Sequence, residues 1–266
     1  MTPLTAYIEG IGVLGPGLID WPSAAAVLSA ATPYAPAATV LPTPLSLPPA
    51  ERRRTSVVVK LALAIGFEAT TRAGIDRSTL PAVFSSSGGD GFNCHEICQV
   101  LASSERQLSP TRFHNSVHNV AAGYWSIAAS ATAAANVLCA FDASFGAGLL
   151  EALTQVAVER TPLLLLAYDT QYPEPLRAKR PIPDAFGVAF VLAPGARASA
   201  LAKLTAMLTE SDGDRMSEPQ LEDLRVSIPA ARGLPLLRKL ARREGGRVTL
   251  DYFPHLRLAL EVEPCN

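Results

Sequence analysis

Hydrophobic positions along the chain fall into short runs of strand length and longer stretches with helical spacing. Apolar residues alternate or run unbroken over strand length at residues 6–13, 81–87, 136–141, 163–167 and 187–192. They recur at helical spacing in residues 21–29, 51–73 and from 149 onward. This order of strands and helices predicts an α/β protein with a mostly parallel five-stranded sheet and helices on both faces.

The same pattern predicts how these elements end and continue. Six prolines interrupt residues 32–49, remove backbone donors and predict an extended surface loop. Gly74 follows the second helix and is expected to cap it. The carboxyl-terminal part has fewer predicted elements. It predicts strands at 200–208, 247–252 and 256–261, a polar stretch at 210–222 and one amphipathic helix at 234–243.

Composition and charge narrow the function classes. The hydrophobic content of 48% allows a substantial core, and 23 basic residues nearly balance 24 acidic ones. Without a basic block, nucleic acid is not expected as a partner. The first ten residues lack a basic leader, and no run of eighteen apolar residues occurs. We therefore expect a cytoplasmic protein without an integral membrane segment.

The four cysteines do not form a disulfide framework at this chain length. Cys94 and Cys98 flank His95 and Glu96, but no second Cys or His pair completes a tetrahedral zinc site. The two thiols are expected one turn apart on a helix, buried as small hydrophobes. No metal and no cofactor are expected.

Residues 137–152 are the most informative segment. A buried strand passes through a sharp turn, Asp142-Ala143-Ser144, into a helix. Such a strand-turn-helix elbow is where α/β enzymes hold a nucleophile. The preceding segment is Phe113-His114-Asn115-Ser116-Val117-His118-Asn119-Val120-Ala121-Ala122-Gly123.

This elbow, together with residues 113–123, the helix 52–73 and Ser85-Ser86-Ser87-Gly88-Gly89, resembles the β-ketoacyl synthase family, in order and spacing, over residues 6–208. The resemblance implies a thiolase-like half-fold. In that family a nucleophilic Cys stands at the elbow, ten residues before a helical Ala. Counting back from Ala152 leads to Asp142.

The resemblance implies a catalytically inactive chain-length factor, as in aryl polyene or type II fatty acid-like synthesis. The family's two catalytic His residues belong to the second half, where this chain has only His255. A synthase-like domain would cover residues 1–195, and residues 196–266 would be a reduced α+β remnant packed on the same sheet. The expected partners are an active synthase, in a heterodimer, and an acyl carrier protein with a phosphopantetheine-bound chain.

A missing half would leave the apolar elbow helix and an edge of the sheet exposed, which predicts a large partner interface. The elbow strand is where synthases of this family join their sheets. The candidate tunnel and interface residues are Phe141, Phe145, Tyr124, Trp125 and Asn119.

Other roles are open for the elbow residues. Asp142 is expected to cap the helix, since a carboxylate accepts hydrogen bonds from exposed helix amides; the alternative is a hydrogen-bonding role at an interface or tunnel. An alternative function is a serine-dependent acyltransferase or hydrolase with Ser144 as nucleophile and His118, or His114, as base. Cys139 is expected to point into the sheet packing, away from the exposure that a reactive thiol requires.

One glycine-rich segment and one basic segment are the last candidates for binding sites. Gly146-Ala147-Gly148 lacks the third glycine of a dinucleotide fingerprint. The arginines at 52–54 are expected to be a solvated helix start, with contact to a carrier protein or its phosphopantetheine as the alternative.

Overall fold

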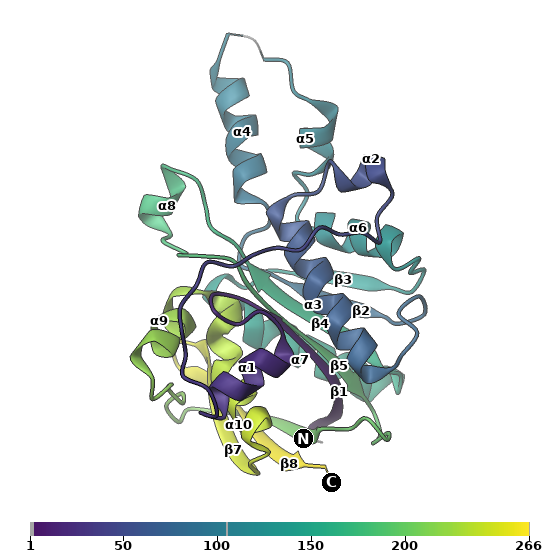
Figure 1. The fold of residues 1–266 in the computed structure, drawn as a ribbon, viewed down its shortest axis with the longest axis vertical. Helices are drawn as coiled ribbons and strands as arrows, with labels where there is room; N and C mark the ends of the chain where they lie inside the picture. The colour runs from purple at the N-terminus through teal and green to yellow at the C-terminus, as the bar shows by residue number, and fades with distance from the viewer. Residues whose placement is uncertain (1–2, 105, 266) are drawn as a thin grey trace.

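The predicted strands come together in one mixed sheet, which a computed structural model describes for residues 3–104 and 106–265 (Figure 1). Within these residues the sheet has eight strands, in the order β3-β2-β4-β5-β1-β6-β8-β7. The strands are β1 (Leu4–Leu14), β2 (Ala82–Ser85), β3 (Ala135–Leu138), β4 (Leu163–Asp169), β5 (Phe186–Ala193), β6 (Ala202–Thr209), β7 (Gly246–Phe253) and β8 (Leu256–Pro264). Each overlaps a segment in which the apolar pattern predicts a strand.

The α/β class is confirmed, but the direction and number of the strands differ from the prediction. Only β2 pairs in parallel, with β3 and with β4. The remaining neighbours, from β4 through β5 and β1 to β7, are antiparallel. A strand that is buried on both faces has a continuous apolar run in either direction. The runs in β4 and β5 therefore could not reveal that these two strands are antiparallel. The carboxyl-terminal strands join the same sheet along the free edge of β1.

Helices cover both faces of the sheet, as predicted. They are α1 (Trp21–Leu28), α2 (Pro49–Arg52), α3 (Val57–Ala73), α4 (Gly91–Ala102), α5 (Pro110–His114), α6 (Val120–Ala128), α7 (Ser144–Glu159), α8 (Leu176–Lys179), α9 (Pro219–Ser227) and α10 (Leu234–Arg242), with 3-10 turns η1 (Phe141–Ala143) and η2 (Pro229–Gly233). One hydrophobic cluster holds α3 and α6 against β2, β4 and β5. The other holds α1, α7 and α10 against the opposite face.

Local signals in the sequence set several helix ends. The carboxylate of Asp20 accepts a hydrogen bond from the backbone N–H of Ser23 at 2.8 Å and caps α1. Gly74 ends α3 with a φ of 59°, in the left-handed conformation that favours glycine. The helix predicted over residues 51–73 is interrupted, because α2 ends at Arg52 and α3 begins at Val57.

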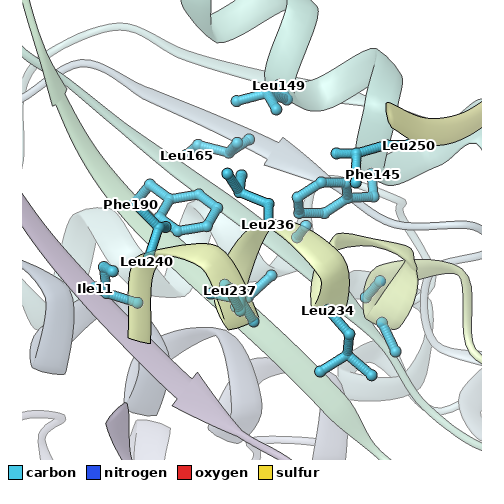
Figure 2. Packing of buried hydrophobic residues seen from close by; sticks show 14 of the residues in the cluster. Ile11, Phe145, Leu149, Leu165, Phe190, Leu234, Leu236, Leu237, Leu240 and Leu250 are labelled. Atoms are coloured by element: carbon cyan, nitrogen blue, oxygen red, sulfur yellow. The ribbon is translucent and has the colours of Figure 1, made fainter. Parts of the chain in front are cut away.

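Helix α7 is enclosed by the protein itself, which corrects the expectation that its apolar face is exposed. Phe145, Leu149 and Leu153 are fully buried. Strands β1, β2 and β4 pack against this helix, and η2 and β7 of the carboxyl-terminal segment contact it as well. Figure 2 shows Phe145 between Leu250 of β7 and Leu236 of α10. The carboxyl-terminal segment therefore covers the apolar face of α7, which was expected to be left exposed.

Helices α4 and α5 extend away from the body of the molecule (Figure 1). Gly91 is the one residue of α4 that is buried among those described. Cys94 and Cys98 are exposed on α4, which corrects the expectation that both thiols are buried. The cause lies in the tertiary arrangement, because α4 has no covering layer on this side.

Candidate functional site

The elbow between β3 and α7 is built around the hydroxyl group of Ser144. Its Oγ accepts a hydrogen bond from the backbone N–H of Ala140 at 3.0 Å and donates one to the carbonyl of Phe141 at 2.7 Å. These bonds close a 3-10 turn over residues 141–143. Strand β3 is shorter than predicted and ends at Leu138. The hydroxyl of Ser144 therefore supports the turn.

Phe141 occupies an unusual position in this turn. Its φ is 52°, and it is 61% exposed. The left-handed region is unfavourable for a bulky side chain, and such residues persist only where the surrounding structure holds them. The guanidinium carbon of Arg180 lies 3.8 Å from the centre of the Phe141 ring. The aromatic ring is thus held at the surface by a stacked cation.

Asp142 does not cap helix α7, contrary to the prediction. The cap position is Ala143, and no side chain makes a capping hydrogen bond there. Instead, the carboxylate of Asp142 pairs with Arg180 at 2.7 Å and with Arg232 at 3.3 Å. The 3-10 turn holds this carboxylate between Arg180, which precedes β5, and Arg232, which belongs to η2. These arginines come from distant parts of the chain, so the local sequence could not identify them.

A cleft of about 540 Å³ opens beside the elbow. Phe141, Asp142 and Arg232 line one part of it, and Tyr252 and Arg257 line another. Asp251, also in its wall, pairs with Arg257 at 3.2 Å and with Arg225. The cleft thus combines aromatic rings with carboxylates that arginines already neutralise.

The geometry does not support a serine hydrolase. The hydroxyl of Ser144 is buried and engaged in two backbone hydrogen bonds. A serine nucleophile needs a base within hydrogen-bonding reach. Among the hydrogen bonds of the described residues, none joins Ser144 to His118 or to His114. His118 lies beside Gly89, and His114 stacks edge-on against Tyr124 at 6.4 Å.

The candidates in and near α6 divide between core and surface. Trp125 is buried and packs against Phe67 with ring centres 5.3 Å apart. Tyr124 is buried as well, but together with the exposed Asn119 it lines a groove of about 460 Å³. The other walls of this groove include the exposed apolar residues Phe113, Val117 and Ile127.

The thiol of Cys139 is exposed, which corrects the expectation that it points into the sheet. The residue follows the end of β3, and its Sγ lies 3.3 Å from the carbonyl oxygen of Ser87. Ending the strand at Leu138 takes Cys139 out of the alternation on which the prediction depended. Among the described residues, no cluster of His, Cys, Asp and Glu has the composition of a metal site.

Asp169, at the end of β4, is a buried acidic residue that the sequence analysis did not single out. Its Oδ1 accepts hydrogen bonds from the N–H and hydroxyl of Ser87, at 2.8 and 2.6 Å. Its Oδ2 accepts one from the N–H of Ala230 at 2.8 Å. Burial raises the pKa of Asp169 to about 6, while these hydrogen bonds act in the opposite direction. A carboxylate directly after a buried apolar strand was the available sequence signal.

A family comparison identifies the chain. The sequence model described as "Beta-ketoacyl synthase, N-terminal domain" matches residues 24–236. The chain belongs to this family. The resemblance inferred from the elbow is therefore confirmed. No curated protein sequence gives a significant match.

Solved structures show that the family fold extends through nearly the whole chain. A chain in the complex of the ketosynthase ApeO with its chain length factor ApeC, from Xenorhabdus doucetiae, is 24% identical, with a TM-score of 0.72. The match covers 97% of this chain and 99% of that one. The ishigamide ketosynthase/chain length factor is 13% identical, with a TM-score of 0.74 and coverage of 98% and 100%. These likenesses confirm the thiolase-like fold.

The structure also places the candidates from the basic segment and the glycine-rich segment. Arg52 donates a hydrogen bond to the carbonyl of Leu47 at 2.9 Å, whereas Arg53 is exposed. Gly148 lies against Ser85, where a Cβ would come within 2.6 Å of the serine Cβ.

No helix in the described part of the chain is both long and apolar enough to cross a membrane.

The raised pKa of Asp169 predicts a pH-dependent effect of Asp169→Asn. The variant should be less stable, because an amide cannot accept hydrogen bonds on both terminal atoms. The folded-state pKa lies above the ordinary value, so the wild-type group contributes most below pH 3.8 and loses this contribution as pH rises through about 6. The stability deficit of the variant should therefore shrink by up to about 3 kcal/mol between pH 4 and pH 7. Urea unfolding of both proteins measures it; a deficit independent of pH would contradict the shifted titration.

Proposed function

We propose that the chain is a catalytically inactive chain-length factor, which pairs with an active β-ketoacyl-ACP synthase and shapes its acyl or polyene tunnel. The observation that carries the proposal is the pairing of Asp142 with Arg180 and Arg232 at the elbow. This is the position that the family resemblance assigns to the nucleophilic Cys. A carboxylate is a poor acceptor for an acyl group in a thioester exchange, because the resulting mixed anhydride hydrolyses.

The partner surface is proposed at the open edge of β3. The carbonyls of Ala134 and Leu138 accept hydrogen bonds from Ala82 and Ser86 at 3.0 and 3.3 Å. Because main-chain groups alternate along a strand, the N–H and C=O of Ala135 and Val137 point away from β2. An unpaired edge of this kind is a template for pairing with another strand.

Apolar groups near this edge support the same surface. Phe141 is exposed at the elbow that follows β3. Helix α6 packs on β3 and contributes Ile127 and Tyr124 to the apolar groove described above. Aromatic residues that are held rigid in the free protein make efficient interface anchors, because little side-chain entropy is lost on binding. The similar structures include a ketosynthase in complex with its chain length factor and a ketosynthase/chain length factor.

A carrier protein with a phosphopantetheine-bound chain is the second proposed partner. One similar structure has an acyl-carrier protein in complex with its ketosynthase; it is 9% identical, with a TM-score of 0.72. It is similar over 98% of this chain and 99% of that chain. Arg53 is exposed and available for a phosphate group, consistent with the alternative role of the basic segment. A role in aryl polyene or type II fatty acid-like synthesis belongs to this proposal.

Catalytic inactivity predicts that the chain forms no covalent acyl adduct. The purified protein should keep its mass after incubation with an acyl thioester, because Asp142 cannot form the thioester and Ser144 is engaged in the turn. Intact-protein mass spectrometry measures this. An adduct on Ser144 would instead favour the acyltransferase, and an adduct on Cys139 would show that its exposed thiol is reactive.

Assembly with the synthase should depend on β3 and Phe141. The N–H that Ala135→Pro removes points away from β2, and Phe141→Asp places a charge on the proposed anchor. Both variants should shift the complex toward free subunits in size-exclusion chromatography after co-expression. Arg53→Asp is the control and should assemble like the wild type. A wild-type chain that stays monomeric with the synthase at micromolar concentration would exclude the heterodimer. Normal assembly of both variants would place the interface elsewhere.

The tunnel role of Phe145 remains a prediction, and the variant Phe145→Ala separates it from core packing. The ring is fully buried, 6.5 Å from that of Phe190 and close to Gly233. A core role predicts a loss of about 3 to 5 kcal/mol in the free energy of unfolding. A tunnel role predicts longer products from a complex that still assembles. Urea unfolding and the product distribution are the two measurements; unchanged products from an intact complex would contradict the tunnel role.

A further inference from the structure

The proline-rich segment and helix α3 enclose an apolar groove away from the elbow. Its volume is about 690 Å³, within the range of small-molecule sites. The floor comes from β1 and α3, with Leu14, Leu63 and Phe67 among its residues. Val40 and Leu45, on the opposite wall, belong to the proline-rich segment. We call it the proline-loop groove.

The apolar side chains around this groove are unusually exposed. Val40, Leu45 and Ile19 have 78%, 74% and 68% of their surface accessible. They are three of the four most exposed large hydrophobic residues in the described part of the chain; Val158, at 69%, lies outside the groove. Isolated apolar residues on a surface are ordinary, but a contiguous apolar patch around a concave site indicates binding.

The proline-rich segment holds the groove open in the absence of a ligand. The carbonyl of Ala37 accepts a hydrogen bond from the N–H of Gly17 at 2.9 Å. Thr39 donates its N–H to Asp184 at 2.9 Å and its hydroxyl to the carbonyl of Ala185 at 2.8 Å. These bonds tie down a segment whose prolines already restrict φ. Val40 follows directly after this attachment, so the groove wall is formed before a ligand binds.

Charges around the groove favour an anionic group at one position. The carboxylate of Glu68 is occupied, because it accepts N–H groups from Val13 at 2.9 Å and Trp21 at 2.7 Å and pairs with Arg72 at 3.0 Å. Asp20 is engaged in capping α1, as described above. Lys60 lines this groove and also a neighbouring cleft, and no ion pair of the described residues includes it. Arg72, the other cation in the groove wall, is paired with Glu68, so the Lys60 ammonium is the unpaired cation among the lining residues that the structure describes.

We infer that the proline-loop groove binds an amphipathic monocarboxylate, a small molecule with an extended apolar tail and one anionic head. The tail would lie between α3 and the exposed side chains of Val40 and Leu45. The carboxylate would pair with Lys60. This inference is independent of the proposed synthase partnership, because the groove lies apart from β3 and the elbow.

Calorimetric titration of the purified full chain with decanoate tests the inference. Decanoate should bind more tightly than decylamine, which has the same tail with a positive head. Leu45→Asp and Val40→Asp should each weaken decanoate binding about tenfold or more, since they place a charge beside the tail. Val158→Asp matches them in exposure but lies outside the groove, and it should bind decanoate like the wild type. Lys60→Gln should abolish the preference for decanoate over decylamine.

Three results would overturn the inference. One is the absence of decanoate binding to the wild-type chain at millimolar concentration. Another is equal binding by the two groove variants and Val158→Asp, which would assign the binding to the general surface. The third is a preference for decanoate that Lys60→Gln leaves unchanged. If decanoate does not bind and Leu45→Asp instead weakens assembly with the synthase, the groove is a protein contact.

Discussion

The enclosure of helix α7 is the constraint on which the rest of the structure depends. This helix begins at the elbow and is apolar on several sides, so one layer of sheet cannot bury it. Strands β1, β2 and β4 pack against it, η2 and β7 contact it as well, and Leu236 of α10 belongs to the same hydrophobic cluster. The carboxyl-terminal segment is thus an integral part of the core. It buries the same surface that would otherwise have required a second protein.

Hydrogen bonds and an ion pair connect η2, the first part of this carboxyl-terminal segment to contact α7, with the elbow region. The carboxylate of Asp169 joins the loop after β2 to the first residues of η2 through Ser87 and Ala230. Asp142 pairs with Arg232 of η2 on the other side of the elbow. Paired or hydrogen-bonded charges are costly to separate once they are partly removed from water. The two acidic residues therefore help to hold η2 beside the elbow and the end of β4, and α10 follows directly after η2.

The charged and aromatic side chains of the elbow are engaged with one another and with arginines from other elements. An elbow that presents a nucleophile must leave that group accessible to an acyl chain. Here Arg180 and Arg232 neutralise the central carboxylate, while Arg180 also stacks on Phe141. The exposed group at the turn is consequently an aromatic ring. Because α7 is already buried, the case for a synthase partner depends on the β3 edge and the aromatic ring beside it, and no longer on an uncovered helix.

The sequence alone determined the features that depend on neighbours along the chain. Apolar periodicity located the strands, Gly74 marked the end of α3, and the prolines identified the extended segment at 32–49. The order of these features, with the elbow, was enough to identify the family. Each of these signals acts over a few residues, where backbone geometry and side-chain spacing are directly linked.

The tertiary structure decided everything that required knowing which distant groups meet. The apolar runs of β4 and β5 have no direction of their own. The sequence predicted Asp142 as a helix cap, whereas the tertiary structure places Arg180 and Arg232 beside it as ion-pair partners. Cys139 is exposed because β3 ends at Leu138, directly before it. Helix α7 is buried because η2 and β7, far downstream in the chain, pack against it. Hydrophobic burial is non-directional, so a sequence pattern specifies that a surface will be covered, and the tertiary structure specifies by what.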